Sequence, residues 1–322
     1  MDIVRVTNLK KLYGDFTAVD DISFTVRRGE VFGFLGPNGA GKTSTINMMI
    51  GLARPTAGNI VMDGIDVRKQ PKKAQAIMGI VPDESNLYDE MDGFDNLCFC
   101  ASLYGMKKEK REAKAKQLLE QFRLTEAGKR PFKAYSKGMR RKLAIAAGII
   151  HSPQILFLDE PTTGIDVEST RQIRDLIMEL KRQGTTVFIT THYIEDAERI
   201  CDRIAFIVSG KLTALGSLSE LMDSISHDYR IQLSAQENIV QYACDLQAHF
   251  GECSVTGQDN SLLVTSQKRI PLLPVLQYLD DKGVTIYEAK ELHPTLEDVF
   301  IQVTGIGAAQ LKKEKEKGGA RR

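Results

Sequence analysis

The stretch Gly36-Pro37-Asn38-Gly39-Ala40-Gly41-Lys42-Thr43 has the form G-x-x-x-x-G-K-T of a phosphate-binding loop. A short apolar run at 31–35 precedes it and predicts a strand. Residues 44–52 follow it and predict a helix that starts at Ser44. Because a loop of this kind joins the end of a strand to the start of a helix, we expect an α/β fold built around a P-loop.

The residue types in this loop fit a nucleoside triphosphate bound with Mg²⁺. Glycines let successive backbone N–H groups turn toward phosphate oxygens, and the start of a helix adds unpaired N–H groups and a positive dipole end. Lys42 is expected to reach the β- and γ-phosphates, and the hydroxyl of Thr43 to ligate the Mg²⁺. The predicted nucleotide-binding residues here are Gly36, Pro37, Asn38, Gly39, Ala40, Gly41, Lys42, Thr43 and Ser44.

Length and composition indicate a soluble protein with room for a second domain. The 322 residues carry a net charge of +1 and are 42% hydrophobic. A charge this close to balance argues against a surface dominated by contacts to nucleic-acid phosphates. The sequence predicts neither a signal peptide nor a membrane span. Five cysteines without C-x-x-C spacing predict no metal site and a reduced, cytosolic compartment.

Two later apolar runs end in residues suited to catalysis. The run 153–158 predicts a buried strand that ends in Asp159 and Glu160, and the run 186–189 predicts one followed by His192. The carboxyl ends of parallel strands are where ligands bind in α/β sheets. One of the two acids would hold the hydration shell of Mg²⁺, and the other would orient a water molecule for attack on the γ-phosphate.

Three further residues are candidates because of their positions. Tyr13, in a loop upstream of the P-loop, is predicted to stack on adenine. Asp83 follows a predicted strand at 77–81, at the nucleotide edge of the sheet. Ser136 precedes an apolar helix that ends near Ile150, so it is expected to occupy an N-cap where free donors could meet an anion. The segment 87–129 predicts a helical insert.

The last third of the chain predicts a separate small module without a catalytic cluster. Residues 210–223 are interpreted as a connector, and the pattern from 229 to 289 predicts the element order β-α-β-β-α-β of a ferredoxin-like domain. Thr295 and Asp298 have the spacing of a capping box, which predicts a final helix. The charged residues 305–322 predict a disordered tail.

These motifs, in this order and spacing, resemble the ATP-binding cassette (ABC) ATPases that drive membrane transporters. The resemblance covers about residues 1–218 and implies a nucleotide-binding domain of mixed sheet, with a helical subdomain at about 84–150 and an accessory α+β domain at 219–304. It implies roles for five residues: adenine stacking by Tyr13, metal binding by Asp159, water activation by Glu160, contact with the opposite subunit by Asp166 and γ-phosphate sensing by His192.

The resemblance also implies that two such domains enclose two ATP molecules, with Ser136 and Gly138 of one subunit contacting the ATP of the other. Two departures from the family pattern stand out. Lys137 replaces the first glycine of the Leu-Ser-Gly-Gly-Gln signature, as in export ATPases with a separately encoded permease. Asp83 stands where the family has a glutamine near the metal, and a metal-binding role is carried over to its carboxylate.

The expected function is therefore Mg²⁺-dependent ATP hydrolysis that powers export. The protein is expected to work as a homodimer on the cytoplasmic face of the membrane, attached through a transmembrane permease, with no nucleic-acid partner. One alternative is a soluble ABC ATPase that acts on nucleic acid or the ribosome, which tandem cassettes, a long coiled coil or a basic stripe would favour. Another is a stand-alone P-loop kinase or GTPase, which would have no use for Ser136 and Gly138 before a helix.

Overall fold

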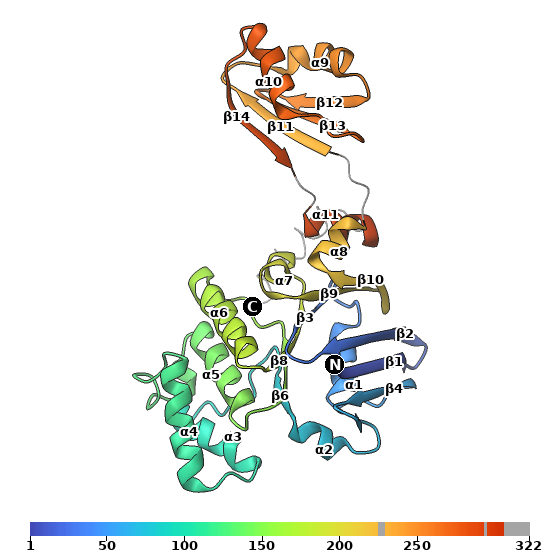
Figure 1. Cartoon of the computed structure of the whole chain (residues 1–322). Helices are drawn as coiled ribbons and strands as arrows, with labels where there is room; N and C mark the ends of the chain where they lie inside the picture. Colours follow the sequence, from blue (N-terminus) through green and yellow to red (C-terminus); the bar gives the residue numbers. More distant parts are fainter. Residues whose placement is uncertain (225–228, 293–294, 306–322) are drawn as a thin grey trace. The chain divides into compact units, whose positions relative to one another are not determined.

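The structure is a computed structural model that describes residues 1–224, 229–292 and 295–305 (Figure 1). It divides into two compact units. The first comprises residues 1–218 together with residues 303–305, and the second comprises residues 219–302. The predicted charged tail, apart from Gly305, lies outside the described residues.

A six-stranded sheet forms the centre of the first unit, in the order β10-β9-β3-β8-β7-β6. Its strands are β3 (Val31–Leu35), β6 (Met78–Val81), β7 (Ile155–Asp159), β8 (Thr186–Thr191), β9 (Arg203–Val208) and β10 (Lys211–Ser217). All neighbours pair in parallel except β9 and β10. The carboxyl ends of β3, β7 and β8 therefore lie side by side, and the P-loop, the two acids and His192 follow these ends.

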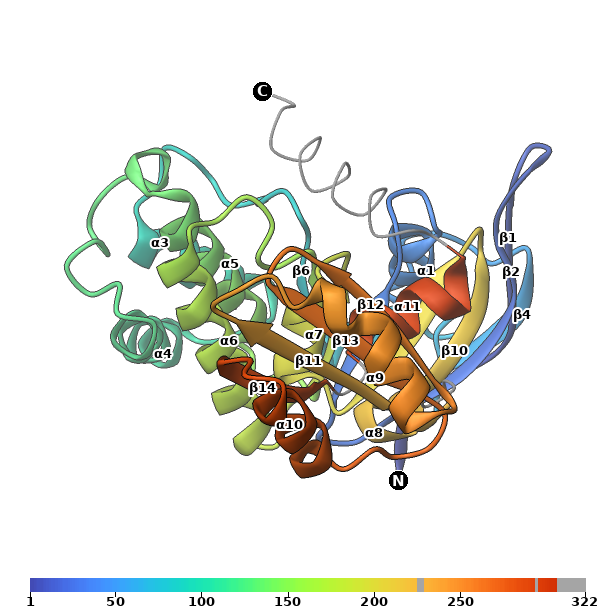
Figure 2. The ribbon, with the colours of Figure 1, turned by 90° about the horizontal axis from the view of Figure 1, so that it is seen from above.

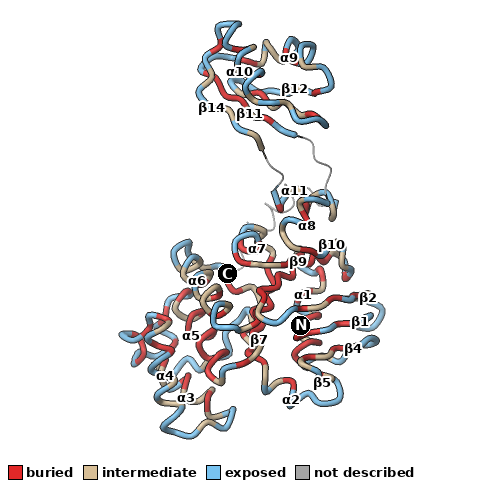
Figure 3. Tube along the Cα trace, viewed as in Figure 1, coloured by how far each residue is buried: buried red, intermediate tan, exposed pale blue. Residues whose placement is uncertain are grey.

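A second, antiparallel sheet has the order β2-β1-β4-β5. Its strands are β1 (Asp2–Tyr13), β2 (Phe16–Arg27), β4 (Ala57–Met62) and β5 (Ile65–Asp66). Phenylalanine rings join the two sheets: Phe24 stacks on Phe32, and Phe32 stacks on Phe188, each with ring centroids 5.6 Å apart. Figure 3 shows the buried residues in red along the central strands. The P-loop strand is thus held in a rigid aromatic core.

Replacing Phe188 with alanine should lower the free energy of unfolding of this unit by about 3–5 kcal/mol, because the fully buried ring contacts four other rings and a cavity would remain. Chemical denaturation followed by circular dichroism measures the change. Phe16→Ala is the matched control, since the Phe16 ring is 64% exposed. Similar losses for the two variants would contradict the expected burial effect.

Helices cover the central sheet and form the insert. They are α1 (Lys42–Met49), α2 (Pro71–Ala76), α3 (Gly93–Leu103), α4 (Lys108–Gln121), the short 3₁₀ helix η1 (Phe132–Ala134), α5 (Lys137–Ile149), α6 (Val167–Arg182) and α7 (Ile194–Ile200). Buried residues of α3, α4 and α5 belong to one core cluster with one face of the central sheet. In Figure 2 these three helices gather at the opposite side of the first unit from β1, β2 and β4. The predicted helical insert is confirmed.

The second unit confirms the ferredoxin-like prediction. It holds α8 (Leu218–Asp223, of which Leu218 belongs to the first unit), β11 (Tyr229–Ala235), η2 (Val240–Tyr242), α9 (Ala243–Phe250), β12 (Cys253–Gln258), β13 (Ser261–Ser266), α10 (Leu272–Asp281), β14 (Ile286–Leu292) and most of α11 (Leu296–Thr304). The strands pair antiparallel in the order β12-β13-β11-β14. Thr295 and Asp298 cap α11 reciprocally, as the capping box predicts, because each backbone N–H donates to the other side chain.

The predicted connector at 210–223 is wrong. Its first part is β10, which forms a hairpin with β9, and its last part is α8. The turn between the strands places Ser209 and Gly210 at φ values of +48° and +79°. A Ser-Gly pair between two strands is a known hairpin signal, but glycine and polar residues on β10 made the segment look irregular.

Candidate nucleotide-binding site

The backbone of the P-loop leaves donors free for an anion. Gly39 and Gly41 have φ values of +80° and +106°, a region that side chains other than glycine rarely adopt. A Cβ at Gly41 would also overlap the carbonyl oxygen of Ala18. Helix α1 begins at Lys42, two residues earlier than predicted, and its N-cap Gly41 supplies no side-chain acceptor. The first N–H groups of α1 therefore have no capping side chain and remain free to bind phosphate.

Lys42 lies at the centre of the site with only 6% of its side chain exposed. Its ammonium donates hydrogen bonds to the carbonyl oxygens of Gly36, at 2.7 Å, and Pro37, at 3.2 Å. The same nitrogen is 3.4 Å from Oε1 of Glu160. The P-loop and the end of β7 are thus joined by a buried cation that faces oxygen atoms only.

The two acids at the end of β7 differ in their surroundings. Asp159 accepts a hydrogen bond from the hydroxyl of Thr190 on β8, and burial raises the pKa of its carboxyl. Glu160 has a φ of +48°, which is uncommon outside glycine, and its N–H donates to the carbonyl oxygen of Thr190 at 3.1 Å. This turn in the backbone directs the Glu160 carboxylate to Lys42 instead of continuing the strand.

His192 holds the other oxygen of the Glu160 carboxylate. Its Nδ1 is 2.8 Å from Oε2, and the hydroxyl of Thr163 donates to the same oxygen at 3.1 Å. Because a carboxylate only accepts, we assign the proton of this contact to Nδ1. Burial favours the neutral acid, but the hydrogen bond from His192 and the charge of Lys42 outweigh it and lower the pKa of Glu160. Glu160 is therefore an anion at neutral pH.

Asp83 lies beside the acids but has a cationic partner. Its side chain is 54% exposed, and Nη2 of Arg141 is 3.3 Å from Oδ1. Burial, together with the negative charges of Glu160 and Asp159, raises the pKa of Asp83 against the effect of Arg141. The predicted metal role of Asp83 therefore competes with an ion pair that the sequence did not indicate.

Known proteins are similar to this chain in sequence. The family model described as "ABC transporter" matches residues 19–163. The linearmycin resistance ATP-binding protein LnrL of Bacillus subtilis is 34% identical over 306 residues, which is 94% of this chain and 98% of LnrL. The chain belongs to the ABC transporter family. A Doxorubicin resistance ATP-binding protein DrrA of Mycobacterium tuberculosis is 35% identical over 308 residues, 94% of this chain and 93% of DrrA.

Solved structures agree with the fold of this ABC protein. An ATP-binding subunit of an ABC transporter is 29% identical, with a TM-score of 0.63 over 69% of this chain and 92% of that one. A post-hydrolysis ABC cassette bound to ADP and Pi is 25% identical, with a TM-score of 0.62 over 67% of this chain and 98% of that one. The first unit is therefore an ABC cassette, and the protein binds and hydrolyses ATP.

The residues predicted to act across two subunits lie at the starts of two helices, α5 and α6. Ser136 is the N-cap of α5, as predicted, and accepts from the N–H of Met139 at 3.3 Å. Asp166 is the N-cap of α6 and accepts from the N–H of Ser169 at 2.8 Å, which lowers the pKa of its carboxyl. A Cβ at Gly138 would overlap the side chain of Ser169. The start of α5 thus packs closely on α6, and only glycine fits there.

Tyr13 is not in a loop, so that part of the prediction is wrong. It is the last residue of β1, where it pairs with Phe16 across a tight turn. The residue is 49% exposed, and Nζ of Lys11 lies 4.7 Å from the centroid of its ring. The ring is accessible to a base, and adenine stacking remains a prediction.

Sequence reasoning missed three residues that support this site: Thr163, Thr190 and Arg141. Thr190 orients Asp159 and binds the backbone of Glu160. Its position at the end of an apolar strand, directly before the predicted histidine region, was a usable signal. Arg141 lies in α5, and nothing in its spacing points to the acids, because the contact to Asp83 joins residues 58 apart.

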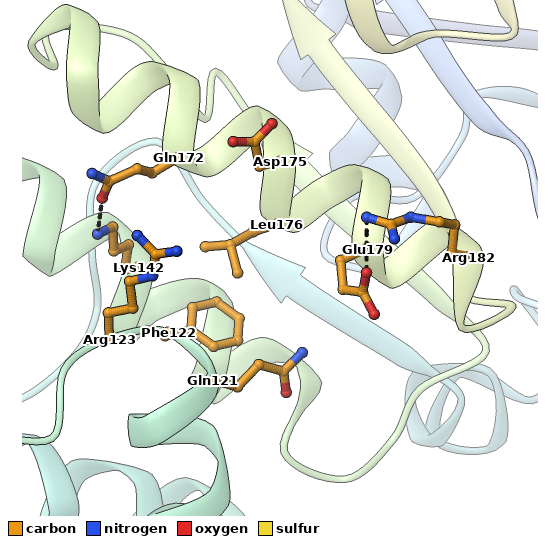
Figure 4. A pocket seen from close by; sticks show the side chains of 9 residues that line it. All are labelled: Gln121, Phe122, Arg123, Lys142, Gln172, Asp175, Leu176, Glu179 and Arg182. Carbon is orange, nitrogen blue, oxygen red and sulfur yellow. Dashed lines mark hydrogen bonds and ion pairs between the residues drawn. The ribbon is translucent and has the colours of Figure 1, made fainter.

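A separate hollow of about 240 Å³ lies between α4, α5 and α6 (Figure 4). Lys142 donates to the amide oxygen of Gln172 at its edge, and Arg182 pairs with Glu179 at 2.8 Å. Gln172 in turn donates to Glu168 at 2.7 Å, so the charge of Lys142 has an indirect partner. No P-loop residue lines this hollow. The hollow lies where the helical insert packs against α6, and it is distinct from the nucleotide-binding site.

Proposed function

We propose that this ABC ATPase supplies the energy for export through a separate transmembrane permease. The observation that carries the proposal is similarity along nearly the whole chain, accessory unit included, to ATP-binding proteins named for resistance to linearmycin and doxorubicin. No helix in the part of the chain that the structure describes is long and apolar enough to span a membrane. We accordingly infer attachment to the cytoplasmic face of the membrane through the permease.

We infer that ATP is bound with Mg²⁺, whose chemistry would be to neutralise charge on the phosphates. Asp159 and the hydroxyl of Thr43 offer the hard oxygen ligands that this ion prefers. Among the described residues, no group of three or more His, Cys, Asp or Glu side chains is arranged to hold a metal. That fits an ion bound by few protein ligands, with phosphate oxygens as the others.

The residues of the site divide the chemical work between them. Lys42 would exchange the carbonyl oxygens of Gly36 and Pro37 for phosphate oxygens. Glu160, as an anion, would accept a hydrogen bond from the attacking water and orient it, while His192 keeps the carboxylate in place. Positioning of this kind is most of what phosphoryl transfer needs from a protein.

We propose that two copies close on two ATP molecules. The site of one copy would then be completed by Ser136, Gly138 and Asp166 of the other. All three lie at the start of a helix, where backbone N–H groups or a side chain can contact a nucleotide. Reopening after hydrolysis would deliver the movement to the permease.

The helical insert offers a surface for the permease. Around residues 83–99, Tyr88 is 53% exposed and rests edge-on against Phe99, with ring centroids 5.1 Å apart. At the end of α3, Leu103 and Tyr104 are 70% and 44% exposed. Exposed aromatic and aliphatic side chains close together are typical of a protein-binding surface.

Affinity purification of the tagged, full-length protein from detergent-solubilised membranes tests the proposal. We expect a protein with several membrane spans to co-purify, and ATP hydrolysis to require Mg²⁺. Nucleic acid in place of that protein would support the soluble alternative. The aromatic-to-acidic variant Tyr88→Glu should reduce recovery of the permease without changing ATP binding, because Tyr88 contacts Asn96 and Phe99 and not the P-loop.

Replacing His192 with alanine should shift the acid limb of the kcat profile to higher pH, besides lowering kcat. The hydrogen bond from His192 lowers the pKa of Glu160, so its loss lets burial raise that pKa, and the active anion forms only at higher pH. Residual ATP hydrolysis measured from acidic to neutral pH gives the shift. His249→Ala, in the second unit, should leave the profile unchanged. An unmoved acid limb in His192→Ala would argue against this role.

A further inference from the structure

Arg141 connects three segments of the cassette. It lies in α5 with 8% of its side chain exposed. Its Nη1 donates to the carbonyl oxygen of Pro82, and its Nη2 to that of Asp83, both at 2.7 Å. Nη2 also lies 3.3 Å from the carbonyl oxygen of Glu160. One guanidinium therefore fixes the loop after β6 and the turn after β7 to the same helix.

The carboxylate that pairs directly with Arg141 is that of Asp83, and the charges of Asp159 and Glu160 also act on the guanidinium. Oδ1 of Asp83 lies 3.3 Å from Nη2. Arg141 is the buried member of this pair, with 8% of its side chain exposed, whereas 54% of the Asp83 side chain is exposed. Removing Asp83 leaves the buried guanidinium without this counter-ion, whereas removing Arg141 leaves a carboxylate that is half exposed to water.

The position of Arg141 on α5 gives the contact its functional meaning. Ser136 is the N-cap of α5, and Arg141 follows about one and a half turns later. In the closed pair, Ser136 would meet the nucleotide bound by the partner copy. The same helix would then contact the partner's ATP at its start and the backbone of its own Glu160 through Arg141.

We propose that Arg141, paired with Asp83, is a positioning residue that couples the placement of α5 on the partner's ATP to the placement of Glu160 in its own site. The proposal rests on the proposed function of the dimer. Arg141 makes no contact with the P-loop among the described hydrogen bonds and ion pairs, so its role concerns the rate of hydrolysis and not the affinity for ATP.

A double-mutant cycle on the full-length protein tests the coupling. Arg141→Gln should lower kcat about tenfold to a hundredfold through misplacement of Glu160, while KM for ATP changes little. Asp83→Gln alone should also lower kcat, because the buried guanidinium loses its counter-ion. The double variant Asp83→Gln with Arg141→Gln removes both charges, so its loss of kcat should be smaller than the product of the two single losses.

Cooperativity between the two sites provides a second readout that a merely structural role would not move. ATP titrations of hydrolysis should give a lower Hill coefficient for Arg141→Gln than for the unaltered protein. Unchanged kcat and Hill coefficient in Arg141→Gln would overturn the proposal. A double variant whose loss of kcat equals the product of the two single losses would overturn the pairing with Asp83.

A matched control separates this role from the general loss of a buried arginine. Arg203 is 9% exposed, donates to the carbonyl oxygen of Thr25 and pairs with Glu30, each at 3.2 Å. It is the first residue of β9, at the end of this strand that lies away from the P-loop. Arg203→Gln should lower thermal stability but leave kcat and the Hill coefficient of the folded protein unchanged.

Should Arg141→Gln fail to fold, Arg141→Lys keeps the charge but not the planar fork, and should still lower kcat at unchanged ATP affinity. A fully active Arg141→Lys would overturn the positioning role. Light scattering of the unaltered protein with ATP distinguishes the two levels of proposal, because failure to form a dimer would reject the proposed closure of two copies itself.

Discussion

Glu160→Gln should reduce ATP turnover by about a hundredfold to ten-thousandfold while leaving ATP bound. The amide is nearly the same size as the carboxylate, so contacts with His192 and Thr163 can persist. The amide of glutamine cannot accept a proton, and it cannot hold the attacking water as an anion does. Since Glu160 is kept anionic by Lys42 and His192, the loss of this single charge removes the property that the site is arranged to maintain.

Turnover measured by phosphate release, and the dimer fraction by light scattering with ATP and Mg²⁺, provide the check. We expect Glu160→Gln to accumulate as an ATP-bound dimer, because closure no longer leads to hydrolysis. Glu198→Gln, an exposed acid on α7, should behave like the unaltered protein. Turnover near that of the unaltered protein in Glu160→Gln would remove Glu160 from the mechanism.

Sequence alone could place Asp159, Glu160 and His192 together, because each follows an apolar strand and parallel strands end at one edge of a sheet. The orientation of these residues could not be predicted. The positive φ of Glu160 depends on the hydrogen bond to Thr190 across the β7–β8 pair, and a strand pattern carries no record of such a turn.

Contacts between distant segments were beyond sequence reasoning for a similar reason. Asp83 could be placed at the nucleotide edge of the sheet from its position after β6, but its pairing with Arg141 depends on how α5 packs on the sheet. Residue spacing was sufficient to predict contacts between residues that are close in the sequence. The cap of α5 by Ser136 and the capping box of Thr295 and Asp298 both involve residues three apart, and both were predicted correctly.

Lys42→Ala should weaken ATP binding by about tenfold to a hundredfold, the range expected when hydrogen bonds from one charged group are lost. Without nucleotide, the ammonium is already held by the carbonyl oxygens of Gly36 and Pro37 and by Glu160. ATP therefore gains only the difference between phosphate and these oxygen partners, which keeps the expected effect within this range. Equilibrium titration with a fluorescent ATP analogue measures the change directly.

Two controls make the Lys42 result decisive. Lys69→Ala removes a lysine whose side chain is 80% exposed and should leave ATP affinity unchanged. A denaturation curve for Lys42→Ala shows whether the chain is folded, since losing Lys42 also leaves Glu160 without its nearest cation. If folded Lys42→Ala bound ATP as tightly as the unaltered protein, the predicted contact between Lys42 and the phosphates would be wrong. The ion pair between Lys42 and Glu160 would then only stabilise the fold, and it would no longer place Glu160 near the phosphates.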